Sequence, residues 1–408
     1  MNSGKTAVFG MTLSHFFHAP RPTSCPRMIF FASIIFFYVI VTGNSAKLFA
    51  DSIFDTDPDI VFLEAGGNAL RAKDIIIGDA YSILAQSETH QDVRSTADLL
   101  TGASFSSMIS TQIQRTDIII QSLMDQITSV NFSQRTFSVW ASGYGGIGNI
   151  KDNTCSGYDY HLYGGMVGVE FNALGKFRLG ALYSLGKTSL DSSMKFGSMT
   201  ADSQDNLIGG YAKWQSILLG GYSFLVGDYT FNRYETERNI LEDYYSGKFN
   251  GSQWGVYFEK GWHATVGVFN LNSFFAIHYQ NLRTDAFSEA FPEDCPGTLA
   301  LYKDGMNFDS LRLFAGARTT YHLGMFSFSL NVTYVREFMD KNPCGMTSFV
   351  NGGDSVMIVG RGLGSDWINA GAGVKFSLGN CISFMANYNG NWGDSLFHTG
   401  VGTLRLDF

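Results

Sequence analysis

The amino-acid sequence predicts an all-β chain: a transmembrane barrel of twelve antiparallel strands, with an N-terminal amphipathic helix threading its pore. In residues 396–408, apolar or small residues alternate with mostly polar ones. This period of two is typical of a strand, and a strand that ends the chain on Phe408 needs a partner along its edge. Strand signals also follow one another from Arg135 onward, joined by alternately short and long connections. A soluble sandwich accounts for the last strand but not for that alternation.

The composition argues against several classes of protein. Only 16% of the residues are charged, against about 25% in soluble domains. The chain holds 46 Gly, 35 Phe and 19 Tyr but only 7 Pro. Its formal net charge is −8 and its basic residues form no cluster, so we expect no nucleic-acid partner. The five cysteines lie far apart without CxxC or Cys/His spacing, which argues against a zinc site.

Residues 1–50 have the features of a secretory signal peptide with a long n-region. The apolar run at 28–41 is too short for a membrane-spanning helix, and three basic residues precede it. Small residues follow, and we expect cleavage near Ala46 or Ala50. A signal anchor is the alternative interpretation.

Residues 51–103 form a short segment between the signal and the helix. The segment is too short to bury a sizeable core of its own. Three aspartates from Asp55 onward resemble the start of an EF-hand calcium loop. However, the sixth loop position is Ile60 rather than Gly, and the twelfth is Gly66 rather than Glu. We therefore expect no metal here.

Residues 104–134 contain the predicted helix. Between 104 and 130 apolar side chains recur every three or four positions with polar ones between them, after a break near Gly102. A helix of this length is about 40 Å long, enough to cross a bilayer core of about 30 Å. Because it is too polar to face lipid, we expect it to thread a polar pore; a coiled-coil or packing helix is the alternative.

Twelve strand signals lie within residues 135–408. In one of them, Phe326, Phe328 and Leu330 alternate with serine and asparagine, so one face suits lipid and the other a polar lumen. The twelve lie near 136–148, 158–172, 176–190, 204–215, 218–234, 249–260, 269–283, 310–322, 326–337, 366–377, 381–390 and 396–408.

The connections between these strands favour an outer-membrane barrel. Tight connections at 172–176, 215–218, 322–326 and 377–381 alternate with longer polar ones. Short periplasmic turns and longer outer loops are typical of such barrels. The longer connections are expected at 149–157, 191–203, 235–248, 284–309 and 338–365, and 391–395 is a short outer loop.

Two motifs resemble enzyme signatures but lack the required context. Gly143 to Gly148 has the spacing of a dinucleotide fingerprint, yet no helix follows it. Gly393 opens a lipase-like Gly-Asp-Ser-Leu motif, with too little chain after it for a catalytic Asp and His. His398 falls on the lipid-facing phase of the last strand. We expect no catalytic site, no cofactor and no enzymatic activity.

Charged residues occupy the inward phase of several strands, where we place Arg178, Glu259, Arg312, Arg318, Lys375 and Arg405. On the lipid face each basic residue would cost roughly 2–4 kcal/mol near the midplane, so the inward position is expected in any case. Two readings stay open: contact with polar groups of a helix in the pore, or solvated lumen charges balanced by Glu259 and Asp407.

The most specific similarity lies in Tyr334, Arg336, Glu337 and Phe338. The chain resembles the translocator domain of the autotransporter family (type V secretion), which carries a Tyr/Trp-x-(Arg/His)-Glu-Phe segment in a strand of its C-terminal third. The opening of the first strand, the second strand and the chain terminus match the same family pattern, at 139–144, 163–170 and Phe408. The resemblance covers about residues 104–408.

The resemblance implies a twelve-stranded barrel with an α-helix in its pore. It implies insertion into outer-membrane lipid by the barrel-assembly machinery, after export by the general secretion pathway and escort by periplasmic chaperones. That machinery would recognise the terminal strand, through Leu404, Leu406 and Phe408. The domain would carry an N-terminal passenger to the cell surface.

The chain departs from the family in two ways. Family passengers usually have hundreds of residues, whereas only 51–103 is present here. Some members cleave between paired Asn residues in the pore helix, but Asn131 stands alone, so we predict no release.

We therefore expect a translocator that moves or anchors its short N-terminal segment at the cell surface. The alternatives are a stand-alone porin-like channel and an adhesin that acts through its outer loops. Cys295 and Cys344 lie in two neighbouring outer loops and are the candidate pair for a disulfide.

Overall fold

The structure is a computed structural model that describes Ile83, residues 90–128 and most of 136–408. Its gaps after residue 136 fall at 151–156, 174–176, 195, 216–220, 293–298, 340–341, 353–354 and 380. The predicted signal segment, 1–50, lies outside the described residues, and so does Asn131.

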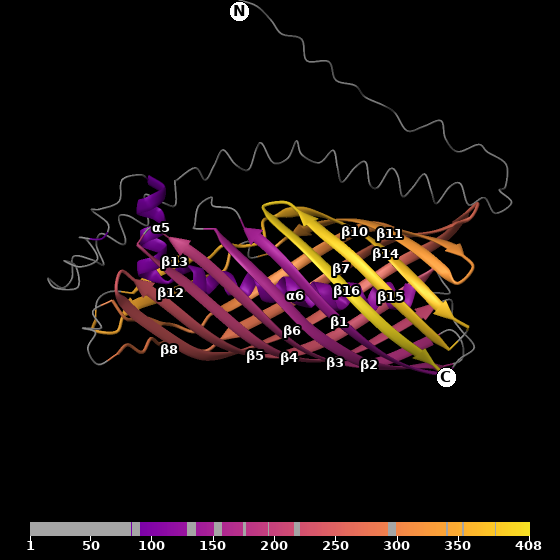
Figure 1. The fold of residues 1–408 in the computed structure, drawn as a ribbon, viewed down its shortest axis with the longest axis horizontal. Helices are drawn as coiled ribbons and strands as arrows, with labels where there is room; N and C mark the ends of the chain where they lie inside the picture. The colour runs from indigo at the N-terminus through magenta and orange to yellow at the C-terminus, as the bar shows by residue number, and fades with distance from the viewer. Residues whose placement is uncertain are drawn as a thin grey trace, which may run out of the picture. The chain divides into compact units, whose positions relative to one another are not determined.

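Twelve antiparallel strands close into a barrel, which confirms the predicted fold (Figure 1). Around the ring the order is β1-β16-β15-β14-β11-β10-β7-β6-β5-β4-β3-β2. The barrel strands are β1 (Phe137–Ile150), β2 (Tyr158–Ala173), β3 (Phe177–Met194), β4 (Gly197–Gln215), β5 (Tyr222–Ile240), β6 (Asp243–Val266), β7 (Phe269–Thr284), β10 (Asn307–Leu323), β11 (Phe326–Glu337), β14 (Asp366–Leu378), β15 (Ile382–Trp392) and β16 (Ser395–Asp407).

The first and last strands close the ring. β16 pairs with β1 from Ser138 opposite Asp407 to Ile150 opposite Ser395. Beyond that ladder, the amide of Phe408 donates to the carbonyl of Phe137 at 2.8 Å. Because the ring is closed, no strand edge is left unpaired. An unpaired edge in a bilayer would leave backbone N–H and C=O groups without hydrogen-bond partners.

The two faces of the last strand differ as the alternation predicts. Leu404 points outward and is 38% exposed, whereas its neighbours Thr403 and Arg405 are buried inside the barrel. Along β11, inward polar and outward apolar residues alternate in the same way, whereas the inward residues of β2 are mostly aromatic or apolar and face the helix side of the lumen. The barrel wall therefore offers lipid an apolar surface and keeps its polar groups in the lumen.

Among the described residues, two helices precede the barrel, α5 (His90–Thr101) and α6 (Ala103–Thr128). Gly102 separates them with a φ of 69°, a left-handed conformation that favours glycine. α6 runs inside the ring of strands, and its described side chains are mostly buried (Figure 1). Neither helix among the described residues is long and apolar enough to cross a membrane.

A second sheet of four short strands, absent from the sequence prediction, lies in the two longest connections. Its order is β13-β12-β9-β8. These strands, β8 (Phe287–Ser288), β9 (Leu301–Lys303), β12 (Cys344–Phe349) and β13 (Val356–Val359), are called the cap below.

Two predicted long loops are wrong. Where loops were expected at 191–203 and 235–248, β3 continues to Met194 opposite Gly197, and β5 continues to Ile240 opposite Asp243. Polar residues dominate these stretches, so the composition resembles that of a loop, but the ladder pairing continues. The contrast in connection length therefore comes mainly from the two connections that hold the cap.

The barrel has a turn end and a loop end. β2–β3, β6–β7, β10–β11 and β14–β15 join at the turn end, where β1 begins and β16 stops. The cap belongs to the loop end, where it contacts the start of α6. α6 therefore begins near the loop end and leads toward the start of β1 at the turn end.

Candidate functional site

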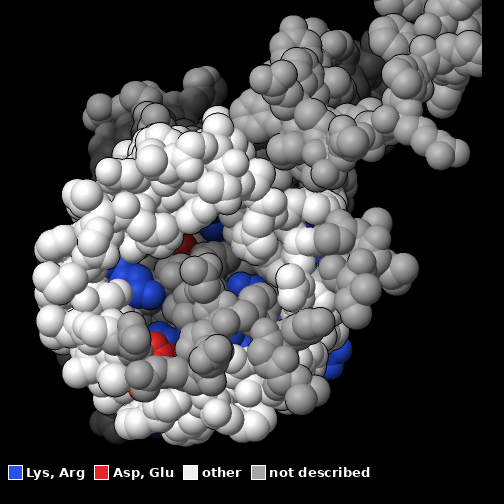
Figure 2. Space-filling model, turned by 90° about the vertical axis from the view of Figure 1, so that its right-hand side faces the viewer, with Lys and Arg blue, Asp and Glu red and all other residues white. Residues whose placement is uncertain are grey.

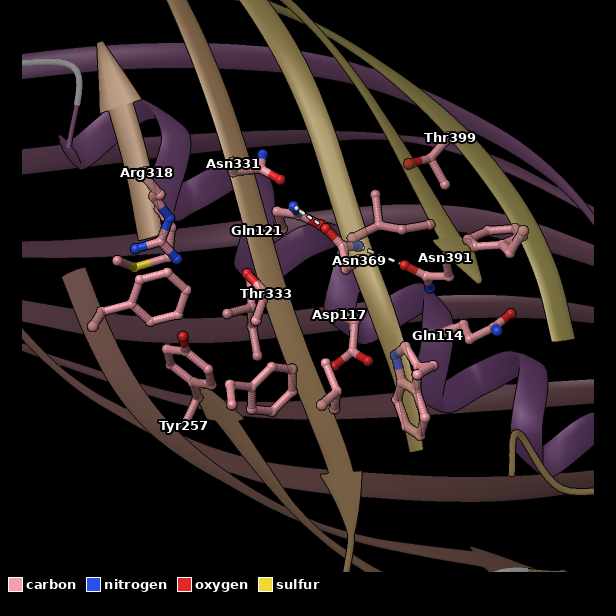
Figure 3. Close-up of a pocket in the computed structure, with 18 residues that line it drawn as sticks. Gln114, Asp117, Gln121, Tyr257, Arg318, Asn331, Thr333, Asn369, Asn391 and Thr399 are labelled. Carbon is pink, nitrogen blue, oxygen red and sulfur yellow. Dashed lines mark hydrogen bonds between the residues drawn. The ribbon is translucent and has the colours of Figure 1, made fainter. Parts of the chain in front are cut away.

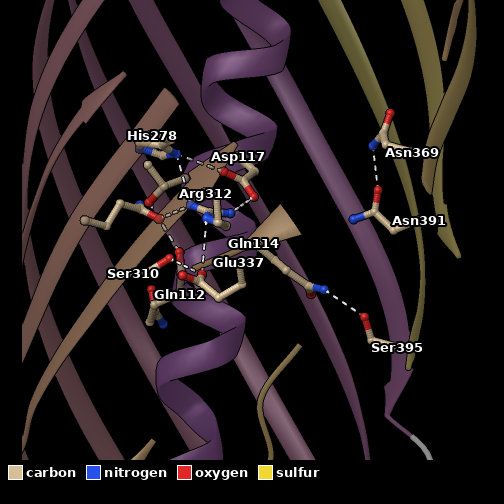
Figure 4. Close-up of polar contacts among 12 residues, drawn as sticks. Gln112, Gln114, Asp117, His278, Ser310, Arg312, Glu337, Asn369, Asn391 and Ser395 are labelled. Atoms are coloured by element: carbon tan, nitrogen blue, oxygen red, sulfur yellow. Dashed lines mark hydrogen bonds and ion pairs between the residues drawn. The ribbon is translucent and has the colours of Figure 1, made fainter. Parts of the chain in front are cut away.

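One cluster of contacts between the helix and the wall centres on Asp117 of α6 (Figure 4). Its carboxylate forms an ion pair with Arg312 of β10, and its Oδ1 lies 3.3 Å from Nδ1 of His278 on β7. Arg312 also donates to the amide oxygen of Gln280. Arg312 and His278 are fully buried, whereas the Asp117 side chain is 23% exposed and lines a cavity beside the helix.

Glu337, the glutamate of the family motif, holds the end of β11 beside that contact. Its Oε1 accepts hydrogen bonds from the amides of Leu311, Phe338 and Met339, at 2.9, 3.1 and 3.0 Å. Its Oε2 accepts from the Ser310 hydroxyl and lies 4.0 Å from Nε of Arg312. Glu337 thus fixes the local backbone and places a carboxylate beside Arg312.

The other three motif residues lie on the outside of the barrel. Tyr334 donates a hydrogen bond to Asp366, and Arg336 lies 3.7 Å from the same carboxylate. Arg336 and Phe338 are more than half exposed. The motif therefore combines one inward carboxylate with outward groups at the end of the strand.

Arg115 is anchored to a different part of the wall. Its Nη1 lies 3.6 Å from Oδ2 of Asp205 on β4, and its Nε donates to the Tyr144 hydroxyl at 3.1 Å. One turn earlier, Gln112 donates to the Ser203 hydroxyl at 2.5 Å. Ser203 also donates to Asp205 at 3.1 Å, so the two wall groups support each other.

Neutral amides line the side of the lumen formed by β11, β14 and β15 (Figure 3). Gln121 of α6 donates to Asn369 at 3.2 Å and to Asn389 at 3.0 Å. Asn331 donates to the same Asn389 oxygen at 3.0 Å. A cavity of about 60 Å³ remains between the helix and this wall. The cavity has room for water, and its lining combines apolar side chains with amide and hydroxyl groups that water could contact.

Buried ion pairs form a belt inside the turn end. Glu170 of β2 lies 3.2 Å from Arg178 and 2.6 Å from Arg405, which also contacts Asp407 at 2.9 Å. Looking into the turn end, Figure 2 shows basic side chains gathered in the hollow with a few acidic ones. These charges neutralise one another across strands far apart in sequence.

The belt continues around the lumen to β6 and β10. Arg318 donates to both carboxylate oxygens of Glu259, at 2.7 and 3.0 Å, and stacks 3.7 Å above the Phe274 ring. Lys375 lines a cavity of about 30 Å³ together with Asp125 of α6 and Arg318. The six charged residues placed inward by the sequence thus lie at three places: the belt, this small cavity and the Asp117 contact.

The cap holds the corner between the two helices. Arg238 of β5 is fully buried and donates to the carbonyls of Leu99 and Leu100, at 2.9 and 3.1 Å. The same guanidinium forms an ion pair with Glu289, which also accepts the amide of Leu301 at 2.8 Å. Helix, barrel strand and cap therefore meet at one arginine.

Sequence reasoning missed Arg238, Glu289, Asp117 and Arg115 as contact residues. One signal was available for the last two, because α6 has only three charged residues, Arg115, Asp117 and Asp125. Charges on a helix destined for a pore mark contacts with wall charges. No comparable signal marks Arg238, whose partner lies 51 residues away.

Two other predictions stay untested. Cys344 has a free, exposed thiol, while Cys295 lies outside the described residues. Leu404 and Phe408 are exposed on the outer face of β16, at 38% and 63%, and Leu406 is partly buried. Their recognition during assembly stays a prediction.

Comparison with known proteins gives a family and a fold. The family model described as "Autotransporter beta-domain" matches residues 139–389. The translocator domain of the autotransporter NalP from Neisseria meningitidis is similar, with a TM-score of 0.58 and 14% identity, over 76% of this chain and 100% of that one. The transport unit of AIDA-I from Escherichia coli matches with a TM-score of 0.47 and 14% identity, over 76% and 99%. No curated protein matches.

Lys303 generates a prediction about the cap. Its Nζ donates to the Ser106 hydroxyl of α6 at 2.9 Å and lies 5.8 Å from the Phe105 ring centroid. Burial lowers the pKa of Lys303 to about 7, against the opposing effect of the Glu289 charge. In an opened cap this amine would titrate at its usual pKa of about 10.4. Closing the cap therefore releases a proton between about pH 7 and 10, so closure strengthens as pH rises through this window.

We predict that Lys303→Met makes the cap more stable at pH 7 and abolishes this pH dependence. Hydrogen exchange of the cap strands at pH 7 and 9.5, corrected for intrinsic exchange rates, checks both effects. Lys248→Met serves as the control, because that side chain is 67% exposed and pairs only with Glu235 in the described structure. An unchanged pH slope in Lys303→Met would contradict the assignment.

Proposed function

This chain belongs to the autotransporter family and is an outer-membrane translocator barrel, and we propose that it carries residues 51–103 to the cell surface and anchors them there. The barrel is a transport unit. Residues 1–50 serve as the export signal in this proposal, and the absence of a second Asn beside Asn131 leaves the segment attached.

The direction of α6 is the observation that carries this proposal. The helix begins under the cap at the loop end and leads toward β1 at the turn end. In an outer-membrane barrel the short turns face the periplasm and the loops face outward. The chain that enters α5 therefore comes from the outer side, as expected for a segment that has already been translocated.

The contacts within the lumen support anchoring rather than an open channel. α6 forms ion pairs with β4 and β10 and hydrogen bonds with several other strands. Two cavities beside it in the described part of the lumen measure about 60 and 30 Å³, and most of the described side chains of α6 are buried against the wall. A helix held in this way blocks the lumen and ties the preceding residues to the membrane.

Surface display is tested with an epitope inserted within residues 51–82 and protease added to intact cells. We expect the epitope to be lost while the barrel stays intact. A second epitope within residues 174–176, which connect β2 to β3 at the turn end, serves as the control and should resist until the outer membrane is opened. Protection of the first epitope in every condition would contradict surface display.

We also propose that the barrel-assembly machinery recognises β16 through Leu404, Leu406 and Phe408. Deleting Phe408 should lower the amount of inserted barrel several-fold, whereas the barrel that does insert should keep its heat-modifiable gel mobility. The matched control is Phe137→Ala, which removes the ring 6.2 Å from that of Phe408 but leaves the terminal residue. Normal insertion of the Phe408 deletion would contradict recognition, and an equal defect in both variants would assign the effect to strand pairing.

A further inference from the structure

We propose that Arg115 and Asp117, called the charge pair below, act as a stop that fixes the final position of α6 in the pore. This inference rests on the proposed translocation, because a stop has meaning only for a helix that moves into place. It sets how many residues remain outside the barrel when transport ends.

Charge is scarce on α6. Its 26 residues include only Arg115, Asp117 and Asp125 as charged side chains, and the rest are apolar, hydroxyl or amide residues. Arg115 is 1% exposed, and the Asp117 side chain, 23% exposed, pairs with an arginine that is 0% exposed. A buried charge without a partner is strongly unfavourable, so these side chains discriminate between positions far more sharply than their neighbours do.

The charge pair faces two separate places on the wall. Arg115 meets Asp205 on β4, and Asp117 meets Arg312 on β10, four strands away around the ring. At about 100° per residue, two positions turn the helix by roughly 200°, which directs the two side chains to different sides. Both contacts can therefore form together only at one height and one rotation of the helix.

The wall partners are held in place by neighbours on the wall itself. Ser203 donates to Asp205 at 3.1 Å, while Gln280 and His278 contact Arg312, His278 at 3.0 Å. Glu337 lies 4.0 Å from Arg312 and is itself fixed by three backbone amides. The family-motif glutamate thus acts as a positioning residue for the arginine that receives the helix.

The hydrogen bonds between neutral side chains of α6 and the wall discriminate poorly between positions of the helix along the pore. Gln114 reaches Ser395, Gln121 reaches Asn369 and Asn389, and Gln126 reaches Ser142. Amides and hydroxyls recur along both the helix and the wall, so a helix displaced by one turn meets similar partners. A displacement of one residue moves the helix by 1.5 Å and turns it by about 100°, which separates both ion pairs.

The test measures helix position by disulfide crosslinking in the assembled full chain. Ser203→Cys is combined in turn with Met108→Cys, Gln112→Cys or Thr116→Cys, after the native cysteines are replaced by serine. With the charge pair intact we expect a crosslink only at Gln112, whose side chain contacts Ser203. With Arg115→Gln and Asp117→Asn together, we expect the Gln112 crosslink to fall and those one turn away to appear.

The matched control is Gln114→Leu with Gln121→Leu, which removes neutral contacts and should keep the single crosslink. A single Gln112 crosslink in the neutralised variant would overturn the proposal, and so would a spread pattern in the control. If the neutralised barrel does not accumulate, the double variant Arg115→Asp with Asp205→Arg replaces it as the test. This variant reverses the ion pair and should keep the single Gln112 crosslink, whereas Arg115→Asp alone should lose it. The same crosslink pattern in both variants would overturn the stop.

Failure of the stop and failure of translocation give different results. The crosslink reports where the helix sits, whether or not the N-terminal segment reaches the surface. A single Gln112 crosslink with a protease-resistant epitope on intact cells contradicts surface display. If the epitope is digested but crosslinks form at several helix positions while Arg115 and Asp117 are unchanged, the stop is contradicted and surface display is not.

Discussion

Pairing between the first and last strands is the constraint on which the rest of this structure depends. Backbone groups in a bilayer core have no water to bond with, so a sheet there must close on itself. β16 meets this requirement against β1 over its whole length, and the ladder reaches the final residue. Closure then forces one face of every strand toward lipid and the other into an enclosed lumen. Polar and charged side chains of the wall are thereby collected in one narrow space.

Polar and charged groups of the lumen wall and of α6 serve as partners for one another. Buried charges such as Arg312, Arg405 and Glu259 need partners, because a buried charge that loses its partner is strongly destabilising. At the turn end these partners come from other strands, so the belt stabilises the barrel itself. Higher in the lumen they come from α6, through Arg115 and Asp117. The helix is too polar to face lipid, and the polar inner face of the wall needs partners. Together they form one continuous interior, which the cap covers at the loop end.

The sequence predicts the barrel well because, along many of its strands, the alternation of residue types shows which face meets lipid and which faces the lumen. The ninth predicted strand coincides with β11, and most other strand starts and ends fall within four residues of the observed ones. The exceptions are β4, which begins seven residues earlier than predicted, β5, which ends six residues later, and β6, which is six residues longer at each end. The cap escaped prediction because β8, β9, β12 and β13 have two to six residues each, too few for a periodic signal. Partners such as Arg405 and Glu170, 235 residues apart, depend on strand register around the ring, which a single sequence does not reveal. Polar hairpins such as β5–β6 resemble loops in composition, and only ladder pairing distinguishes them.

α6 fills the lumen as a bound plug. Single-channel conductance in planar bilayers tests it most directly, by comparing the full chain with a chain that lacks residues 104–130. With the helix present, its side chains are buried against the wall among the described residues, so the full chain should show little or no current. The shortened chain should show stable openings of much larger conductance. Equal conductance of the two chains would contradict the account.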